Sequence, residues 1–356
     1  MGCLRRASAD RTSNPVAKHQ EIFYQISAFG SLCQSAGYKM NSQTFAQSKI
    51  LSGRIRLKWI QDKSRLPLTS DHWPLYRKIH RSYFNALGKF PNLVNSRSLN
   101  DKVQWLKLFD QSDQIIQCSD KLGVREFAKE KLGTSCLLDI YQVADTFQDI
   151  NFDKLPKSFV LKTNHDSGSV VLVRDKSTLD LAALESKFSE SLQRAPHGAH
   201  AGEWGYEFIS RKIFAEEFME PENPAPPPDY KFHCSSGKVG FVHFLYDRGV
   251  DTKEQTLTPE GRDLEFRLSL HYKKGNDFKR PKNWTHLIAA AEKLAENFKY
   301  VRIDLYQSQD RIYLGEMTFW PHAGLYKGDG QEKLGEFIEF DRQTVKPLYR
   351  ATSQTQ

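Results

Sequence analysis

Hydrophobic residues recur at helical spacing in five segments of the chain. Within residues 99–110, for example, Val103, Leu106 and Phe109 fall on one side of a helix. This spacing is typical of a helix that packs one face against a hydrophobic core. The predicted helices cover residues 42–63, 99–110, 121–131, 179–192 and 285–299.

Runs of β-branched and aromatic residues predict strands after residue 158. The clearest are 159–162 and the VVLV run that follows, which together predict a hairpin with its loop at 163–169. The proline-rich segment 221–228 cannot continue a strand, because proline lacks the backbone donor. Helices mixed with hairpins favour an α+β fold over a parallel doubly wound sheet. The other predicted strands cover residues 212–218, 230–234, 239–246, 301–306 and 312–318.

The composition is that of a globular protein without a membrane-spanning segment. Apolar residues make up 39% and charged residues 26% of the 356 residues. No stretch approaches the ~18 consecutive apolar residues that span a bilayer. The first ten residues lack the apolar core of a secretory signal, and the five cysteines include no CxxC pair. We therefore expect reduced thiols and a cytoplasmic location.

The excess of positive charge is confined to the first 70 residues. They carry 11 Lys and Arg against 3 Asp and Glu, whereas the other 286 residues carry 40 of each. A nucleic-acid groove would leave a basic excess in the folded core, so we expect no nucleic-acid partner. We predict a basic, partly disordered extension over residues 1–70, loosest in residues 1–40, and a globular domain over residues 71–345.

Two interpretations are open for the predicted helix at 42–63. Ile50, Ile55 and Trp59 recur at near-helical spacing, with basic residues between them. Such a helix could make a peripheral contact with an anionic membrane surface. Alternatively, it docks on the main domain with its basic face in water. The short apolar stripe favours docking.

Several common catalytic and nucleotide-binding motifs are absent. The chain has no GxxxxGK[ST], GxGxxG, GxSxG or HExxH. It also has no DxD pair, which weakens a metal-dependent glycosyltransferase. The candidate chemistry must therefore come from residues that lie far apart in the sequence.

Two lysines and a polar loop form the first candidate site. Lys162 closes an apolar run, where an ammonium group is costly to bury unless an anion meets it. The loop that follows, NHDSGS, has small residues that let backbone N–H groups turn toward a phosphate. Lys121 precedes it at the start of a predicted helix. The segment 215–219 can offer backbone groups to adenine while a carboxylate takes the ribose hydroxyls.

Two carboxylates, Asp304 and Glu316, lie on consecutive predicted strands. Buried acids there need a cation, and hard oxygen ligands favour Mg²⁺, whereas an exposed face would need only a salt bridge to Arg302. Directly opposite residues share a face, so the register decides whether one ion can bind both acids. A five-residue turn at 307–311 places both acids with Arg302 and Thr318, and a four-residue turn separates them. We predict an odd-length turn, or an even one with a compensating bulge.

Taken in order, these segments resemble the ATP-grasp superfamily, and in particular its TupA-like branch, named for teichuronopeptide biosynthesis. The resemblance runs from about residue 76 to residue 340 and implies an ATP site between two α+β subdomains. The strings that carry it are LNDKVQWLKLFD, SDKLGVREFAKEKLG, FDKLPKSFVLKTNHDSGS, FAEEFME, DYKFHCSSGKV, VRIDLY and YLGEMTFWPHAG.

The resemblance implies roles for the residues of the first candidate site. Lys121 and Lys162 resemble the two lysines that hold the α- and β-phosphates of ATP. Ser167, Gly168 and Ser169 resemble the mobile lid over the phosphates. The adenine and ribose hinge corresponds to Glu216, Glu217 and Met219.

The resemblance also implies roles for the terminal hairpin. Arg302 resembles the arginine that stabilises the transferring phosphoryl group, and Asp304 and Glu316 resemble the Mg²⁺ ligands. In the wider superfamily a third ligand is the Asn of a Glu-x-Asn motif, and here that position is Thr318.

The reaction that the resemblance implies is carboxylate activation with ATP and Mg²⁺ as cofactors. A carboxylate becomes an acyl phosphate, and an amine then forms an amide. The implied substrates are an amino acid, a peptide or a uronic acid of a cell-surface polymer. Lys231, a candidate catalytic residue, Arg248 and His165 are candidate substrate contacts, because cations suit a carboxylate or an acyl phosphate. The alternatives are a glycosyltransferase of polysaccharide assembly and a non-catalytic ATP-grasp scaffold.

Overall fold

The computed structural model describes residues 42–219, 228–247, 251–308 and 311–350. The expectations for residues 1–40, for most of the segment 221–228 and for Arg248 lie outside them. Contacts divide the chain into two units, Met1–Leu57 and Lys58–Gln356. Among the described residues, no helix combines the length and the apolar character that crossing a membrane requires.

Helix α2 (Ser42–Lys63) has the bounds that the hydrophobic spacing predicts. In the first unit, its Ile50 and Leu57 side chains are exposed. In the second unit, Trp59 packs edge-on against Tyr76 of α3 (Trp73–Leu87), with ring centroids 4.8 Å apart. The last turns of α2 therefore dock on α3. The membrane contact and the boundary at residue 70 stay predictions.

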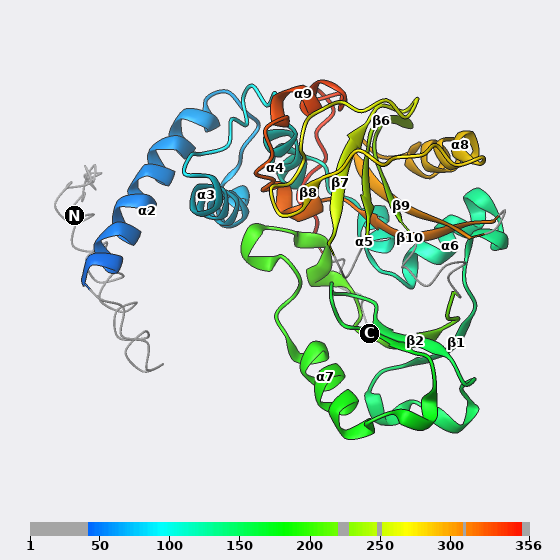
Figure 1. Ribbon diagram of the computed structural model, residues 1–356. Helices are drawn as coiled ribbons and strands as arrows, with labels where there is room; N and C mark the ends of the chain where they lie inside the picture. Colours follow the sequence, from blue (N-terminus) through cyan, green and yellow to red (C-terminus); the bar gives the residue numbers. More distant parts are fainter. Residues whose placement is uncertain (1–41, 220–227, 248–250, 309–310, 351–356) are drawn as a thin grey trace, which may run out of the picture. The chain divides into compact units, whose positions relative to one another are not determined.

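The first sheet has four antiparallel strands in the order β1-β4-β2-β3. Its strands are β1 (Ile140–Ala144), β2 (Phe159–Thr163), β3 (Val170–Val173) and β4 (Ile213–Glu216). One face packs on α7 (Leu181–Gln193) through a buried cluster that includes Phe159, Leu161 and Phe188. Figure 1 shows this sheet and α7 in green. The predicted hairpin at 159–173 is confirmed, whereas β1 was not predicted.

The second sheet has six strands in the order β10-β9-β5-β6-β7-β8. They are β5 (Asp229–Ser235), β6 (Lys238–Tyr246), β7 (Lys253–Leu257), β8 (Lys273–Lys274), β9 (Val301–Ser308) and β10 (Arg311–Thr318). Only the β7–β8 pair is parallel among these described strands. Helix α8 (Trp284–Ala295) contacts β5, β6 and β9 and buries Leu287, Ala291 and Leu294 (Figure 1). Mixed helices and antiparallel sheets confirm the α+β class.

The remaining helices lie before the first sheet and after the second. They are α4 (Leu99–Phe109), α5 (Asp113–Ser119), α6 (Gly123–Leu132) and α9 (Gln331–Glu336). Helix α4 confirms the prediction for 99–110. The predicted helix start at Lys121 is wrong, because α6 begins at Gly123. Asp120 accepts a hydrogen bond from the Leu122 backbone at 2.9 Å and closes a turn there.

The hairpin of β9 and β10 pairs through an irregular register. Ser308 stands opposite Arg311, so only residues 309–310 separate the strands, and the expected five-residue turn is wrong. The register then shifts between Leu314 and Glu316. The expected alternative, an even turn with a compensating bulge, is confirmed. Without the extra residue, Gly315, in the bulge, Glu316 would face away from Asp304.

Candidate active site

Five directly opposed polar residues form a row across the second sheet. Lys231 of β5 stands opposite Asp304 of β9, which stands opposite Glu316 of β10. Beyond Lys231 the row continues with His243 of β6 and Thr256 of β7. Directly opposed residues of antiparallel strands share a face. The fold therefore gathers these side chains on one side of the sheet.

Arg302 joins the two carboxylates of the terminal hairpin. Its Nε donates to Asp304 Oδ1 at 2.6 Å, and its Nη2 donates to Asp304 Oδ2 at 2.8 Å. Nη2 also donates to Glu316 and, at 3.0 Å, to the Thr318 hydroxyl. The predicted grouping of these four side chains on one face is confirmed.

Positive charges hold Glu316 of this cluster ionised. Burial alone would raise the pKa of Glu316, but nearby cations outweigh it and lower that pKa to about 2. Those cations are Arg302, Lys231 and Lys121. Burial would lower the pKa of Arg302, but Asp304 and Glu316 raise it well above its usual value. Lys231 forms an ion pair with Asp304.

The oxygen atoms of Asp304, Glu316 and Thr318 form a donor set that suits Mg²⁺. This ion commonly takes one or two carboxylates and completes its shell with waters and substrate phosphates. Within the described parts of the chain, no group of three or more His, Cys, Asp or Glu residues could hold a metal. Two carboxylates therefore fit an ion that arrives with a nucleotide better than a metal held by protein ligands alone.

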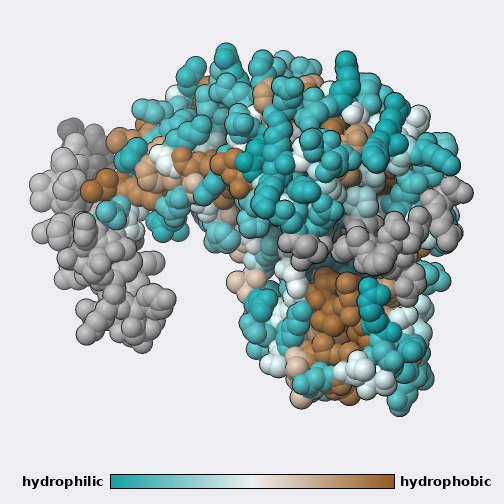
Figure 2. Space-filling model, in the orientation of Figure 1, coloured by the Kyte–Doolittle hydropathy of each residue, from teal (hydrophilic) through white to brown (hydrophobic). Residues whose placement is uncertain are grey.

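The face of the first sheet that points away from α7 carries Lys162 and Glu216, which form an ion pair. Lys162 stands opposite Phe214 and lies 5.3 Å from the centre of that ring. Figure 2 shows a hydrophobic patch over this sheet. An apolar face with a cation and a carboxylate suits a nucleoside with attached phosphates. The exposed apolar side chains on β1 and β3 are Tyr141, Val143, Val170 and Leu172.

The hinge after β4 distinguishes the two adjacent acids. The Glu217 backbone donates to Asp139 O at 2.8 Å, and its carboxylate accepts from Asp139 N at 3.2 Å. Glu217 therefore ties the hinge to the segment before β1. Glu216, in contrast, lies on the face that carries Lys162. Met219 is half-buried and ends the described part of the hinge.

The loop between β2 and β3 turns only part of its polar groups outward. Ser167 and Gly168 are exposed. Gly168 has a φ of 99°, a value that favours glycine. Ser169, however, is buried, and its hydroxyl donates to Asp166. Backbone groups around Ser167 and Gly168 are therefore the ones that can meet a phosphate.

Lys121 brings residues of the two sheets together. Its Nζ donates to the backbone carbonyl of Asp166 in the loop. Burial lowers the pKa of Lys121, while the charges of Glu316 and Asp166 oppose that shift and the charge of Lys162 adds to it. Lys121 lies between α5 and α6, and both helices contact β10, the strand that carries Glu316. One ammonium group therefore lies near both the loop of the first sheet and the acid of the second.

Two predicted substrate contacts lie away from this cluster or outside the described residues. The His165 ring is buried, and its Nε2 lies 3.3 Å from the Ser191 carbonyl of α7. Burial lowers the pKa of His165, which favours the neutral ring. Contact with a substrate would require the ring to leave α7. Arg248 lies outside the described residues.

Sequence reasoning did not single out Tyr206 or the turn Pro321–Gly324. The Tyr206 ring packs edge-on against Trp320, two residues after β10, with ring centroids 5.9 Å apart. His322 and Ala323 have φ values of 51° and 54°, a strained conformation for residues other than glycine. The string FWPHAG marks the position of the turn, but nothing in it signals left-handed backbone.

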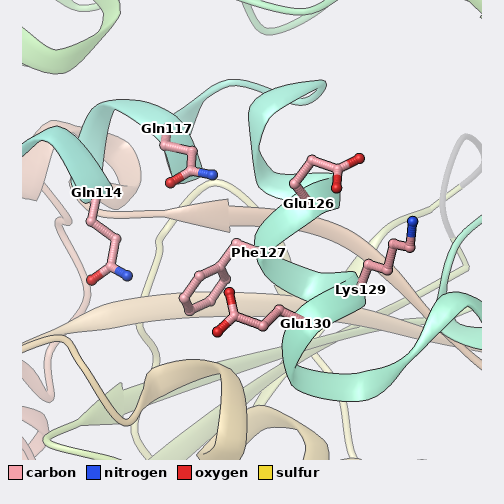
Figure 3. A pocket seen from close by; sticks show the side chains of 6 residues that line it. All are labelled: Gln114, Gln117, Glu126, Phe127, Lys129 and Glu130. Carbon is pink, nitrogen blue, oxygen red and sulfur yellow. The ribbon is translucent and has the colours of Figure 1, made fainter.

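Two hollows of the described surface lie away from these residues. One of about 440 Å³ lies between α5 and α6 (Figure 3). Its lining residues are Gln114, Gln117, Glu126, Phe127, Lys129 and Glu130. Another, of about 770 Å³, is lined by residues from 67–72, 111–113 and 345–350. Neither contains a predicted site residue.

Comparison with known proteins identifies the family of this chain. The TupA-like ATP-grasp family profile matches residues 101–339, which is more than half of the chain. The chain belongs to this family, and its fold is an ATP-grasp fold. A comparison with curated proteins finds no match.

Solved structures with a similar arrangement are ligases and a synthetase. D-alanine–D-alanine ligase from Bacillus anthracis, complexed with ATP, is 16% identical, with a TM-score of 0.37 over 64% of this chain and 66% of its own. The corresponding ligase from Helicobacter pylori is 14% identical, with a TM-score of 0.34 over 68% and 70%. D-cycloserine synthetase is 14% identical, with a TM-score of 0.37 over 62% and 69%.

Proposed function

We propose that this protein is an ATP-dependent carboxylate–amine ligase that releases ADP and acts in the assembly of a cell-surface polymer. Membership of the TupA-like ATP-grasp family supports ATP as the nucleotide. The observation that carries the proposal is the convergence of Lys121, Lys162 and Glu316. Lys121 holds the loop that follows Lys162, and the helices beside Lys121 contact the strand that carries Glu316, which supports a site with two candidate phosphate lysines and a pair of acids suited to Mg²⁺.

The proposed reaction has two steps. A substrate carboxylate oxygen bonds to the γ-phosphorus of ATP, and the bond to the β-γ bridging oxygen breaks, which releases ADP. An amine then bonds to the acyl carbon, phosphate leaves, and the amine loses a proton to give an amide. Such transfers need positioning and charge stabilisation more than covalent catalysis by the protein.

The chain supplies three cations and two acids for this task. Lys121 and Lys162 would hold the α- and β-phosphates, and Arg302 would stabilise the transferring group. Mg²⁺, when bound, neutralises charge on the phosphates. Asp304 and Glu316 would hold that ion, with the Thr318 hydroxyl beside Glu316 at 2.9 Å.

Lys231 is the candidate contact for the substrate carboxylate. It lies on the same face as the acids and forms an ion pair with Asp304. When Asp304 binds a metal ion, its ion pair with Lys231 weakens. The Lys231 ammonium can then pair with an anionic substrate instead. Amino acids, peptides and uronic acids of a polymer all present such a carboxylate. We propose these as the substrate classes, and action at the cytoplasmic side of the membrane as the location.

The test is a screen of amino acids and uronic acids for substrate-dependent ADP release. The expected result is ADP release that needs both a carboxylate and Mg²⁺. It should fall by at least about 100-fold in Asp304→Asn, because that change removes charge that a metal ion needs. The matched control is Asp277→Asn, at an exposed acid outside the cluster.

Other outcomes of the same screen separate the alternatives. Turnover of a nucleotide-sugar without ATP consumption would show a glycosyltransferase. ATP binding without ADP release for any carboxylate would favour a non-catalytic scaffold. Thr318, at the position where the wider superfamily has a metal-binding Asn, is the residue that supports this alternative.

A further inference from the structure

The carboxylate of Asp166 lies at the centre of the loop between β2 and β3. Its Oδ2 accepts hydrogen bonds from the Ser169 hydroxyl at 2.5 Å and the Ser191 hydroxyl at 2.8 Å. Its Oδ1 accepts from the Thr163 hydroxyl. These three partners are buried and belong to β2, the end of the loop and α7. The Asp166 carboxylate therefore links the two ends of the loop to each other and links the loop to α7.

Asn164 connects the same loop to the segment that carries Lys121. Its Oδ1 accepts from Lys212 N at 2.7 Å, and its Nδ2 donates to Asp120 Oδ1 at 2.8 Å and Ser210 O at 2.9 Å. Its backbone carbonyl accepts from Lys121 N at 3.1 Å. Asn164 is 1% exposed, so these bonds hold a buried joint.

The Lys121 ammonium completes this arrangement by donating to the Asp166 carbonyl. One predicted phosphate lysine is thus held on the loop that directly follows the other, Lys162. The exposed backbone at Ser167 and Gly168 lies on the same loop. The network sets the relative positions of two cations and a set of N–H donors.

We propose that Asp166 is a positioning residue for the nucleotide phosphates. Its carboxylate holds loop 163–169 and Lys121 in the shape that receives them, without touching the nucleotide. This inference rests on the proposed function. It also gives the Ser169 hydroxyl a different role, because that group fastens the loop and leaves Ser167 and Gly168 to face the phosphates.

Hydrogen bonding makes a negative side chain tolerable in such a loop. Burial alone would raise the pKa of Asp166, but the hydroxyls of Ser169, Thr163 and Ser191 reverse the shift and lower it. The carboxylate is therefore ionised and fully engaged at neutral pH. A loop held in shape before binding avoids the ordering cost that a flexible loop would add.

The test compares the wild-type protein with Asp166→Asn, which keeps the shape but replaces an acceptor oxygen with a donor. Hydrogen exchange without nucleotide should become faster at backbone amides of 163–169 and 120–122. Calorimetric titration should show that Mg-ADP affinity falls about tenfold, because the loop loses hydrogen bonds that hold it in the shape that binds phosphate. Adenosine affinity should stay unchanged, because adenosine carries no phosphate.

Matched variants separate positioning from a general loss of structure. Asp175, at the opposite end of the β2–β3 hairpin, accepts from the Ser177 amide at 3.0 Å and hydroxyl at 2.7 Å. Asp175→Asn should leave the Mg-ADP affinity unchanged. Ser169→Ala should behave like Asp166→Asn, and Ser169→Thr, which keeps a hydroxyl, should restore the affinity. If Asp166→Asn fails to fold, Ser191→Ala supplies the same comparison from α7.

Two results would overturn the inference. One is unchanged exchange and Mg-ADP affinity in Asp166→Asn, and the other is an equal loss of adenosine and Mg-ADP affinity. A wild-type protein that binds neither ligand would instead refute the proposed function. The exchange comparison would still decide whether Asp166 holds the loop.

Discussion

Lys162, Lys231 and Arg302 of the candidate site each form an ion pair within the protein. Lys162 forms an ion pair with Glu216, Lys231 with Asp304, and Arg302 with both hairpin acids. Buried charges require such pairing, since an isolated charge in the interior is costly. A nucleotide or a metal ion must therefore exchange partners with these groups rather than meet free charges.

We predict that Lys162→Ala weakens Mg-ATP binding by about 1.5–3 kcal/mol, because it removes one charge-assisted contact to phosphate. Lys121→Ala should have a smaller effect in the same direction. Calorimetric titration measures both. The control is Lys157→Ala, at an exposed residue 3.3 Å from Asp175 on the same subdomain. Unchanged affinity in both site variants would contradict the phosphate assignment.

Glu316 makes stability depend on pH. Its pKa in the folded protein is about 2, against an ordinary value of 4.5. The unfolded chain therefore takes up a proton first as the pH falls. The stabilisation from the charged form is complete above the ordinary pKa and is lost between about pH 4.5 and pH 2.

We predict that Glu316→Gln lowers the free energy of unfolding at about pH 6, and that its difference from wild type shrinks at about pH 3. Urea unfolding at a series of pH values measures this difference. Glu332→Gln, at an exposed residue of α9, is the control and should show a constant difference. If the difference in unfolding free energy between Glu316→Gln and wild type does not change with pH, the charge of Glu316 does not stabilise the protein.

At the scale of elements, helix α4 holds the turn that follows β10. Asn100, Gln104 and Lys107 recur at spacings of four and three residues, so they share one face of the helix. They donate to the backbone carbonyls of Tyr326, Gly324 and Ala323 at 2.7, 2.8 and 2.8 Å. Buried polar groups need such partners. The row explains how the strained turn Pro321–Gly324 keeps its conformation.

The bulge in β10 decides which side of the hairpin carries Glu316. A Cβ at Gly315 would lie 2.4 Å from Tyr306 Cε2 and 3.2 Å from Asp304 O. A side chain there would press on the strand that carries the predicted metal ligand. An added Cβ at this position would therefore have to displace the Tyr306 ring and press on the Asp304 carbonyl.

We predict that Gly315→Ala lowers the free energy of unfolding by about 1–3 kcal/mol, the usual cost of overpacking. It should also weaken Mg-ADP binding by disturbing the Asp304–Glu316 pair. Urea unfolding and calorimetry measure the two effects. The control is Gly53→Ala, where an added Cβ meets nothing within 4 Å. Normal stability and affinity in Gly315→Ala would show that the register does not depend on this glycine.

At the scale of the whole molecule, the candidate site draws on both sheets of the second unit. The first sheet supplies Lys162 and Glu216, and the second supplies Lys231 and the hairpin acids. Lys121 donates to the loop of the first sheet and lies between two helices that contact β10 of the second. The site thus depends on how the two sheets are held together, and the family match over residues 101–339 covers all of these positions.

We predict that removal of residues 1–41 leaves ATP turnover unchanged. Each predicted site residue lies after Lys58, in the second unit of the chain. ADP release by the shortened chain is the measurement. A second variant that also lacks residues 42–63 should be less stable, because Trp59 packs on α3. A folded chain without residues 1–41 that has lost turnover would contradict this prediction.

Much of the fold was predictable because its elements are amphipathic along the chain. The regular apolar spacing in α4, α7 and α8 and the apolar runs in β2, β6 and β9 follow directly from which face is buried. Strands β1, β7 and β8 were missed, since Gln142 interrupts the apolar residues of IYQVA, and KEQTL and KK have one and no apolar residue. These segments form strands because their backbones pair with neighbouring strands, β1 with β4 and β7 with β6.

The sequence by itself determined the α+β class, the family and the residues that could carry the chemistry, since these follow from local spacing and from matching strings. Tertiary structure alone decided the register of the terminal hairpin, the inward turn of Ser169 and the burial of His165 against α7. The physical reason is that each depends on a partner distant in sequence. The local sequence permits several conformations at each place. The bulge in β10 selects the register, Asp166 turns Ser169 inward, and the backbone of α7 holds His165.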